Sequence, residues 1–408
     1  MCFDNIFHNR SQPANIPEPH LALFDQIGRI APRVVPALIA VVQLGCANGG
    51  SGPIRIGVAG PFTDPIGRPM QLAAELAADE INASGGVGGR RLELVLRDDY
   101  ANPDSAVFVA GELYDAGVSA VIGHLFSDAT LAAAPVYNGG SDPVVAISPS
   151  SSAPEVSAAG QYTFRVCPSD NAHGAALAQW VRKRLGFQRG AVLYLNDPYG
   201  RGIRRTFVEE FLRLGGELDG VDPYLGDKPA VGPYLDRLAR RRKLDFLLVA
   251  GNRGEAESII RDARARGLSV PVLGGDGLEG IEQAGELGEG VYYSSSYFPG
   301  LPTPSNRRFV EAYRHKFPDA GAPNQPAAAT YDAVYLLRDV IARSGPRREA
   351  VRRALAGVGS VTPAFEGVTG AVSFDAVGDV PNQNVYIGLV HRGRIEVENQ
   401  ATAVAETP

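Results

Sequence analysis

The sequence predicts an α/β protein with two doubly wound lobes built on mainly parallel sheets. The chain has 408 residues, which is long for a single hydrophobic core. From residue 54 onward, short apolar runs typical of buried strands alternate with amphipathic helical segments, and the alternation resumes after residue 172. Strands that alternate with helices are typical of parallel sheets, so the two series predict two sheets.

The first series carries clear signals for the ends of its helices. A helix at residues 70–83 ends at Gly85 and Gly86, and the next helix starts at Asn102 as N-cap with Pro103 in its first turn. The other expected elements are strands at residues 54–60, 92–96, 118–122 and 143–147 and helices at residues 102–116 and 129–137.

The second series repeats this pattern. Helices are expected at residues 172–185, 203–214, 231–242 and 255–266, and strands at residues 190–195, 244–250, 270–273 and 290–294. Pro299, Gly300 and Pro302 follow and suit a crossover between lobes. The last expected elements are helices at residues 306–317, 327–343 and 347–356, strands at residues 370–374 and 384–389, and a disordered tail at residues 399–408.

Composition and charge narrow the classes of function. Hydrophobic residues make up 45% of the chain and charged residues 21%, values typical of globular proteins. The formal net charge of −6 gives no electrostatic reason to expect nucleic acid as a partner. Cys2, Cys46 and Cys167 are too far apart for a disulfide framework, and no cysteine or histidine spacing matches a zinc site, so no metal or cofactor is expected.

The region before residue 54 has the composition of an export signal. Arg29 and Arg33 precede an apolar core at residues 34–42, which is too short to span a bilayer. Leu-Gly-Cys and a Gly/Ser/Asn tether follow, and this pattern resembles a bacterial lipoprotein cleavage site with Cys46 as the lipidated residue. We therefore expect residues 1–53 to be a leader, a signal and a tether.

Polar side chains follow several of the predicted strands. Ser150 and Ser152 lie in the serine-rich turn after the strand at residues 143–147, and Ser127 opens the helix that follows the preceding strand. Ligands of open α/β sheets bind at such strand ends, and the free N–H groups of a helix start can hold a carboxylate. With Asp276 at a strand end of the second series, these hydroxyl groups suit a zwitterion held between two lobes.

Two other motifs have competing interpretations. Residues 275–280 fit the Gly-x-Gly-x-x-Gly pattern of dinucleotide sites, but they lie late in the chain and no acidic strand end follows about twenty residues on. A dinucleotide-dependent enzyme is therefore the less favoured alternative. His124 has no second ligand at metal-binding spacing, so we interpret it as a structural histidine.

Several short motifs share an order and spacing that is specific as a set. They are residues 54–60, 78–87, Asp-Asp at 98–99, Val-Ile-Gly-His at 121–124, Ile-Ser-Pro at 147–149, Asp-Pro-Tyr-Gly-Arg-Gly at 197–202 and residues 370–379. With these motifs the chain resembles the type I periplasmic binding proteins, in the leucine/isoleucine/valine-binding branch of ABC transporter substrate-binding proteins. The resemblance covers nearly all of residues 54–397.

The resemblance implies how the chain is divided. The lobes would exchange strands through three crossovers, near Pro168, Pro299 and Gly378. The implied ranges are residues 54–168 plus 300–378 for the first lobe and residues 169–299 plus 379–398 for the second.

It also implies the ligand contacts. Ser127, Ser150 and Ser152 correspond to the residues that hold the carboxylate and ammonium of an amino acid. Asp276 corresponds to the acidic partner of the ammonium, and Tyr199 to an aromatic wall residue. Asn252 stands where the family has another aromatic residue, and Asn252 with the neighbouring Arg253 suggests a ligand more polar than leucine.

The function implied by the resemblance is capture, not catalysis. We expect a monomeric, lipid-anchored extracytoplasmic protein that closes on an amino acid and presents it to an ABC permease in the membrane. A ligand-sensing protein of the same fold that feeds a signalling receptor is the alternative within this fold.

Overall fold

The structure is a computed structural model that describes residues 52–226, 228–240 and 244–401. Its first sheet has the strand order β2-β1-β3-β4-β5, and all of its strands are parallel. The strands are β1 (Ile54–Gly60), β2 (Leu92–Asp98), β3 (Ala120–Ile122), β4 (Ala146–Ser148) and β5 (Thr163–Arg165). A parallel sheet of this kind places the carboxyl ends of β1, β3 and β4 along one edge, where the serine-rich turn begins.

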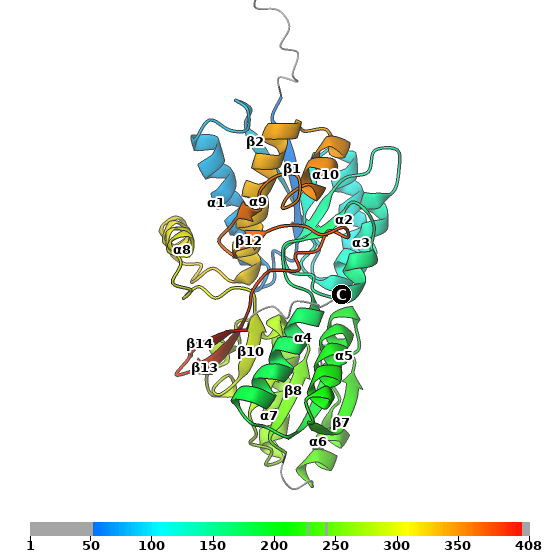
Figure 1. Cartoon of the computed structure of the whole chain (residues 1–408), viewed down its shortest axis with the longest axis vertical. Helices are drawn as coiled ribbons and strands as arrows, with labels where there is room; N and C mark the ends of the chain where they lie inside the picture. Colours follow the sequence, from blue (N-terminus) through cyan, green and yellow to red (C-terminus); the bar gives the residue numbers. More distant parts are fainter. Residues whose placement is uncertain (1–51, 227, 241–243, 402–408) are drawn as a thin grey trace, which may run out of the picture. The chain divides into compact units, whose positions relative to one another are not determined.

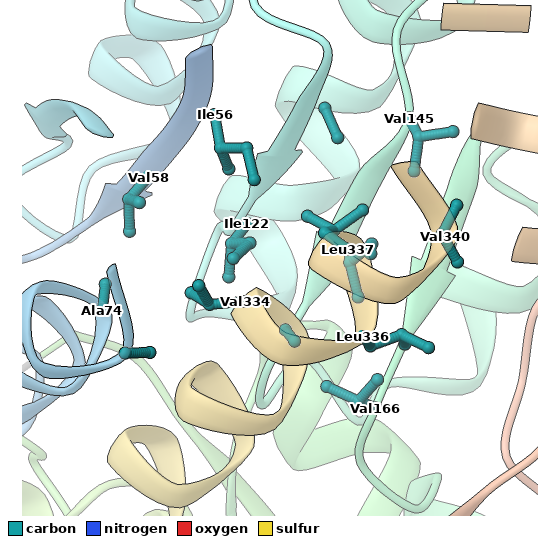
Figure 2. Close-up of a cluster of buried hydrophobic side chains, with 14 of the residues drawn as sticks. Ile56, Val58, Ala74, Ile122, Val145, Val166, Val334, Leu336, Leu337 and Val340 are labelled. Atoms are coloured by element: carbon teal, nitrogen blue, oxygen red, sulfur yellow. The ribbon is translucent and has the colours of Figure 1, made fainter. Parts of the chain in front are cut away.

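Helices cover both faces of the first sheet. Ile56, Val58 and Ile122 face one side, where they pack on α1 (Arg68–Ala83), α9 (Gln325–Ser344) and α10 (Arg348–Ala356). Figure 2 shows Val334 and Leu337 of α9 facing these strand residues. The alternate strand residues pack on α2 (Pro103–Asp115) and α3 (Ser127–Asn138), so the sheet is doubly wound as predicted.

The second sheet has the strand order β14-β13-β10-β9-β8-β6-β7. Its parallel strands are β6 (Arg189–Leu195), β7 (Glu217–Tyr224), β8 (Phe246–Ala250), β9 (Val272–Gly274) and β10 (Tyr292–Ser295), and the antiparallel strands β13 (Val385–His391) and β14 (Arg394–Ala401) extend it. On one face lie α4 (Asp170–Gln179), with its π-helical end η2 (Trp180–Arg184), and α5 (Pro198–Arg213), side by side in Figure 1. On the other face lie α6 (Gly232–Ala239) and α7 (Arg253–Ala265).

The remaining helices and strands belong to neither of the two large sheets. They are η1 (Pro154–Ala158), η3 (Asp276–Leu278), η4 (Ile281–Leu287), α8 (Pro304–Lys316) and the antiparallel pair β11 (Phe365–Glu366) and β12 (Ala371–Val372). No helix in the described ranges is long and apolar enough to cross a membrane.

The chain passes between the sheets three times, after β5, after β10 and after β12. Arg165, fully buried at the end of β5, ties the first of these crossovers to the third. Its N–H donates to the carbonyl of Gly378 at 3.0 Å, and its guanidinium forms an ion pair with Asp379. The same guanidinium donates to the carbonyls of Ser152 (3.1 Å) and Ala153 (2.9 Å).

Most predicted elements are present, with ends shifted by a few residues, but four strands were not predicted. β5 has only three residues and β11 only two, and β7 and β14 are edge strands whose sequences mix apolar with charged residues. Edge strands are half exposed, so they lack the apolar run that marks a central parallel strand. Residues 399–401, predicted as the start of a disordered tail, belong to β14 instead, and residues 402–408 lie outside the described residues.

Candidate functional site

The serine-rich turn after β4 is held by its own hydroxyl groups. Ser148 donates through Oγ to the carbonyl of His124 (2.7 Å) and accepts the N–H of Ser151 at 2.8 Å. Ser151 is fully buried, and its Oγ lies 2.7 Å from Thr130 Oγ1. Two of the serines therefore fix the turn, while Ser150 reaches the wall of a pocket.

Ser127 lies beside this turn at the start of α3. Its Oγ accepts the N–H of Ala153 at 3.1 Å, which fixes the hydroxyl at the edge of the same pocket. The first N–H groups of a helix have no partners within the helix and carry a partial positive charge. Ser127 and the start of α3 therefore form a site suited to a carboxylate, as the sequence predicts.

The second lobe contributes the opposite wall. Asp276 from η3, Tyr199 from α5 and Asn252 before α7 all line the pocket. The hydroxyl oxygen of Tyr199 accepts the N–H of Gly277 at 2.8 Å, so the aromatic ring is fixed beside Asp276. With Ser127 and Ser150, five of the six predicted ligand contacts meet in one pocket.

Asp276 is a buried carboxylate without a full counter-ion. Its exposed fraction is 7%, and its Oδ1 has no hydrogen-bond partner among the described residues. The nearest basic group is His173, whose Nε2 lies 3.8 Å from Asp276 Oδ2. Burial lowers the pKa of His173, which favours the neutral imidazole. A buried charge is costly unless it is paired, so the arrangement favours a ligand cation at Asp276.

Ser152, the sixth predicted contact, does not line the pocket. It is almost completely buried, and its carbonyl accepts the N–H of Asp170 at 2.8 Å. Its Oγ and the carboxylate of Asp170 are both buried. Burial, with a contribution from Asp276, raises the pKa of Asp170, and the Ser152 hydroxyl lowers the pKa of that carboxyl by a smaller amount. A direct contact between Ser152 and the ligand stays a prediction.

The pocket also contains residues that were not predicted as contacts. The pocket has about 430 Å³ of empty space, open solvent included. The other residues that line it are Ile66, Leu125, Phe126, Asp197, Gly277 and Glu279. Asp197 caps α5 by accepting the N–H of Gly200 at 2.7 Å. Glu279 lies within the Gly-x-Gly-x-x-Gly segment, and Asp197 lies two residues before Tyr199, so sequence position offered a hint for both.

Three other predictions have separate outcomes. His124 is fully buried, with Nδ1 2.7 Å from Asp99 Oδ2 and Nε2 3.1 Å from the Tyr137 hydroxyl, which confirms the structural interpretation. Arg253 lies outside this pocket and pairs with Glu257 at 2.7 Å. Cys46, the predicted lipidation site, lies outside the described residues.

A family model described as "Periplasmic binding protein" matches residues 53–394, almost the whole described chain. The chain belongs to the periplasmic binding protein family. This is a family of solute-binding proteins, which favours binding over dinucleotide-dependent catalysis, and its members work outside the cytoplasm.

Similar proteins agree on the branch of the family. The leucine-, isoleucine-, valine-, threonine- and alanine-binding protein of Pseudomonas aeruginosa is 29% identical over 363 residues, which cover 85% of this chain and 92% of the relative. The predicted type I, branched-chain amino acid branch is confirmed.

Solved structures of this branch are similar to most of the chain. The branched-chain amino acid transporter substrate-binding protein of Streptococcus pneumoniae, in complex with isoleucine, is 29% identical with a TM-score of 0.76, covering 85% of this chain and 99% of that one. A leucine-binding protein of Thermotoga maritima is also 29% identical, with a TM-score of 0.77 and coverage of 85% and 98%. The predicted fold class is confirmed.

Proposed function

We propose that this chain is the extracytoplasmic substrate-binding component of an ABC importer and that its ligand is an amino acid. The observation that carries the proposal is the pairing of groups across one pocket. Ser127 and the start of α3 suit a carboxylate. In the opposite wall, the buried carboxylate of Asp276, whose Oδ1 has no hydrogen-bond partner among the described residues, suits an ammonium group. The names of the similar proteins, which bind branched-chain and small amino acids, support the same ligand class.

The mechanism would be closure of the two lobes around the ligand. The carboxylate first meets the hydroxyl groups of Ser127 and Ser150 on the first lobe. Asp276 and Tyr199 then complete the site from the second lobe, and water leaves the pocket. Charge-assisted hydrogen bonds strengthen when water is excluded, so a bound ligand would shift the protein toward its closed form.

The remaining parts of the proposal concern the anchor and the division of the chain. Lipidation at Cys46 would attach the protein to the membrane, near the permease that receives the ligand. The lobes would comprise residues 54–168 plus 300–378 and residues 169–299 plus 379–398, and a single protein molecule would suffice to enclose the ligand. Binding without catalysis is part of the same proposal.

The test is calorimetric titration of the protein with a panel of amino acids. For the ligand that binds, Ser127→Ala and Asp276→Ala should each weaken binding by about 1–3 kcal/mol, because each variant leaves one charged ligand group without its partner. Asp115→Ala is the control, since Asp115 is exposed at the end of α2 and lines none of these cavities. Unchanged affinity in both site variants would contradict this assignment of the contacts, and no binding by any amino acid would contradict the ligand class.

A further inference from the structure

His173 is a buried histidine of the second lobe that lies between Asp276 and Ser294. Its exposed fraction is 1%, and helix α4 places it against β10. Its Nδ1 lies 3.0 Å from Oγ of Ser294, and its Nε2 lies 3.8 Å from Oδ2 of Asp276. Nε2 has no hydrogen-bond partner among the described residues. One ring nitrogen therefore faces a hydroxyl group and the other faces a carboxylate.

These two neighbours decide which ring nitrogen carries the proton of the neutral imidazole. A serine hydroxyl can donate or accept a hydrogen bond, whereas a carboxylate only accepts. With the proton on Nδ1, the lone pair of Nε2 would face the negative charge of Asp276 at 3.8 Å, which is repulsive. With the proton on Nε2, the Ser294 hydroxyl donates to Nδ1 and the Nε2–H group faces the carboxylate. The surroundings of the ring therefore favour the Nε2–H tautomer.

A neutral imidazole at this place has a different effect on Asp276 from a permanent cation. Burial lowers the pKa of His173, against the opposite effect of Asp276, and Arg165 lowers it further. A buried lysine or arginine here would neutralise Asp276 and remove its need for an ammonium group of the ligand. A neutral N–H group stabilises the carboxylate through a partial charge only, so the negative charge stays available for the ligand.

The two oxygens of Asp276 then have separate roles. Oδ2 faces His173, whereas Oδ1 is buried and has no hydrogen-bond partner in the described part of the chain. The hydroxyl of Tyr199 also hydrogen-bonds to the Asp276 carboxylate. Two uncharged groups thus hold the carboxylate, and Oδ1 is the oxygen left for the ligand.

We infer that His173 is a positioning residue for the ammonium group of the ligand: as the Nε2–H tautomer, it holds the Asp276 carboxylate ionised and oriented so that Oδ1 can receive the ammonium. The inference rests on the proposed function, because it takes the contact between Asp276 and the ammonium as given. It deepens that function by assigning a role in binding to a residue that does not itself line the pocket.

The first test is nitrogen NMR of the imidazole rings in the wild-type protein without ligand, at about pH 7. The signals of His173 are those missing in His173→Gln. They should show a protonated Nε2 and an unprotonated Nδ1, and Asp276→Asn should shift the Nε2 signal because the facing negative charge is removed. A proton on Nδ1, alone or together with one on Nε2, would overturn the inference.

The second test is calorimetric titration with L-leucine, or with the amino acid of the panel that binds most tightly. His173→Leu should weaken binding about tenfold, because the Asp276 carboxylate loses the N–H group that faces it. His173→Gln should weaken binding less than about threefold, since its amide nitrogen can take the place of Nε2. The control is His315→Leu, which changes an exposed histidine on α8 and should leave the affinity unchanged.

A double-mutant cycle separates positioning of Asp276 from a general effect on the fold. In the Asp276→Asn background, His173→Leu should change the affinity less than about twofold, because the group through which His173 acts is already altered. An equal loss in both backgrounds, or wild-type affinity in His173→Leu, would overturn the inference although amino acids still bind.

The proposed function fails in a different way. If no amino acid of the panel binds, the proposed function is wrong, and the inference that rests on it is wrong too. Because the tautomer is measured in the wild-type protein, the NMR test decides the inference even if His173→Leu does not fold.

Discussion

Gln325 joins the two walls of the pocket through three hydrogen bonds. Its N–H donates to Glu279 (2.8 Å), its side-chain oxygen accepts from Ser150 Oγ (3.0 Å), and its side-chain nitrogen donates to the carbonyl of Pro149 (3.0 Å). Gln325 thus links Ser150 in one wall to the carboxylate of Glu279 in the opposite wall. Glu279 therefore lines the pocket and also takes part in the contact between its two walls.

The raised pKa of Glu279 predicts a pH dependence of stability. In the folded protein burial raises the pKa to about 8, against 4.5 as the ordinary value, so the folded state holds a proton that the unfolded state releases. The contribution of the Glu279 carboxyl to the free energy of unfolding is therefore fully present below about pH 4.5 and is lost as the pH rises through about 8. Glu279→Gln, which does not titrate, should therefore lose less stability than the wild type between about pH 5 and about pH 8.

Thermal unfolding of both proteins at these two pH values measures the difference. The matched control is Glu286→Gln, which should follow the wild type at each pH because Glu286 is exposed. Equal losses of Tm in Glu279→Gln and the wild type would contradict the prediction.

Helix α9 supports the first sheet and begins at the pocket. Leu337, in its middle, is fully buried among the side chains shown in Figure 2, which include Ile122 and Val340. Leu337→Ala should lower the free energy of unfolding by about 2–5 kcal/mol, because it removes buried apolar surface and leaves a cavity. Urea denaturation measures this loss. Leu212→Ala on α5, where half of the side chain is exposed, should cost less than about 1 kcal/mol, and equal losses in the two variants would argue against this packing.

The elements that could be predicted are those whose signals are local. Asn102 caps α2 by accepting the N–H of Ser105 (3.0 Å), as its sequence position predicts. β7 could not be predicted, because its sequence contains Gly220 and Pro223 and only its place at the edge of the sheet makes it a strand.

In the site too, some positions could be predicted from the local sequence, whereas others depend on contacts between distant parts of the chain. Ser127 and Ser150 follow strands of the first sheet and Asp276 follows a strand of the second, so the position of each at a strand end could be predicted from order along the chain. The role of Glu279 depends on α9, which begins 46 residues later in the sequence and supplies the N–H that Glu279 accepts. Ser152 follows a strand too, but the turn buries it behind the pocket wall, which no local pattern indicates.

For the molecule as a whole, the buried guanidinium of Arg165 joins parts that are far apart in sequence. Arg165→Met should lower the free energy of unfolding by about 3 kcal/mol, because Asp379 and the carbonyls of Ser152 and Ala153 lose their donor. Urea denaturation measures the change. The control is Arg189→Met, which breaks an exposed ion pair with Glu217 and should lower the free energy of unfolding by less than about 1 kcal/mol. If Arg165→Met also cost less than about 1 kcal/mol, the buried ion pair would add no stability.

The link between the first and third crossovers also limits how the protein can move. Because Arg165 fixes β5 to Gly378 and Asp379, these two connections cannot swing independently. Three separate strands would allow the lobes to twist and slide as well as to close. With two of them joined, the lobe closure proposed above would approach a rotation about one axis, which would return Asp276 to the same position opposite Ser127 each time and reduce the alignment required of the ligand.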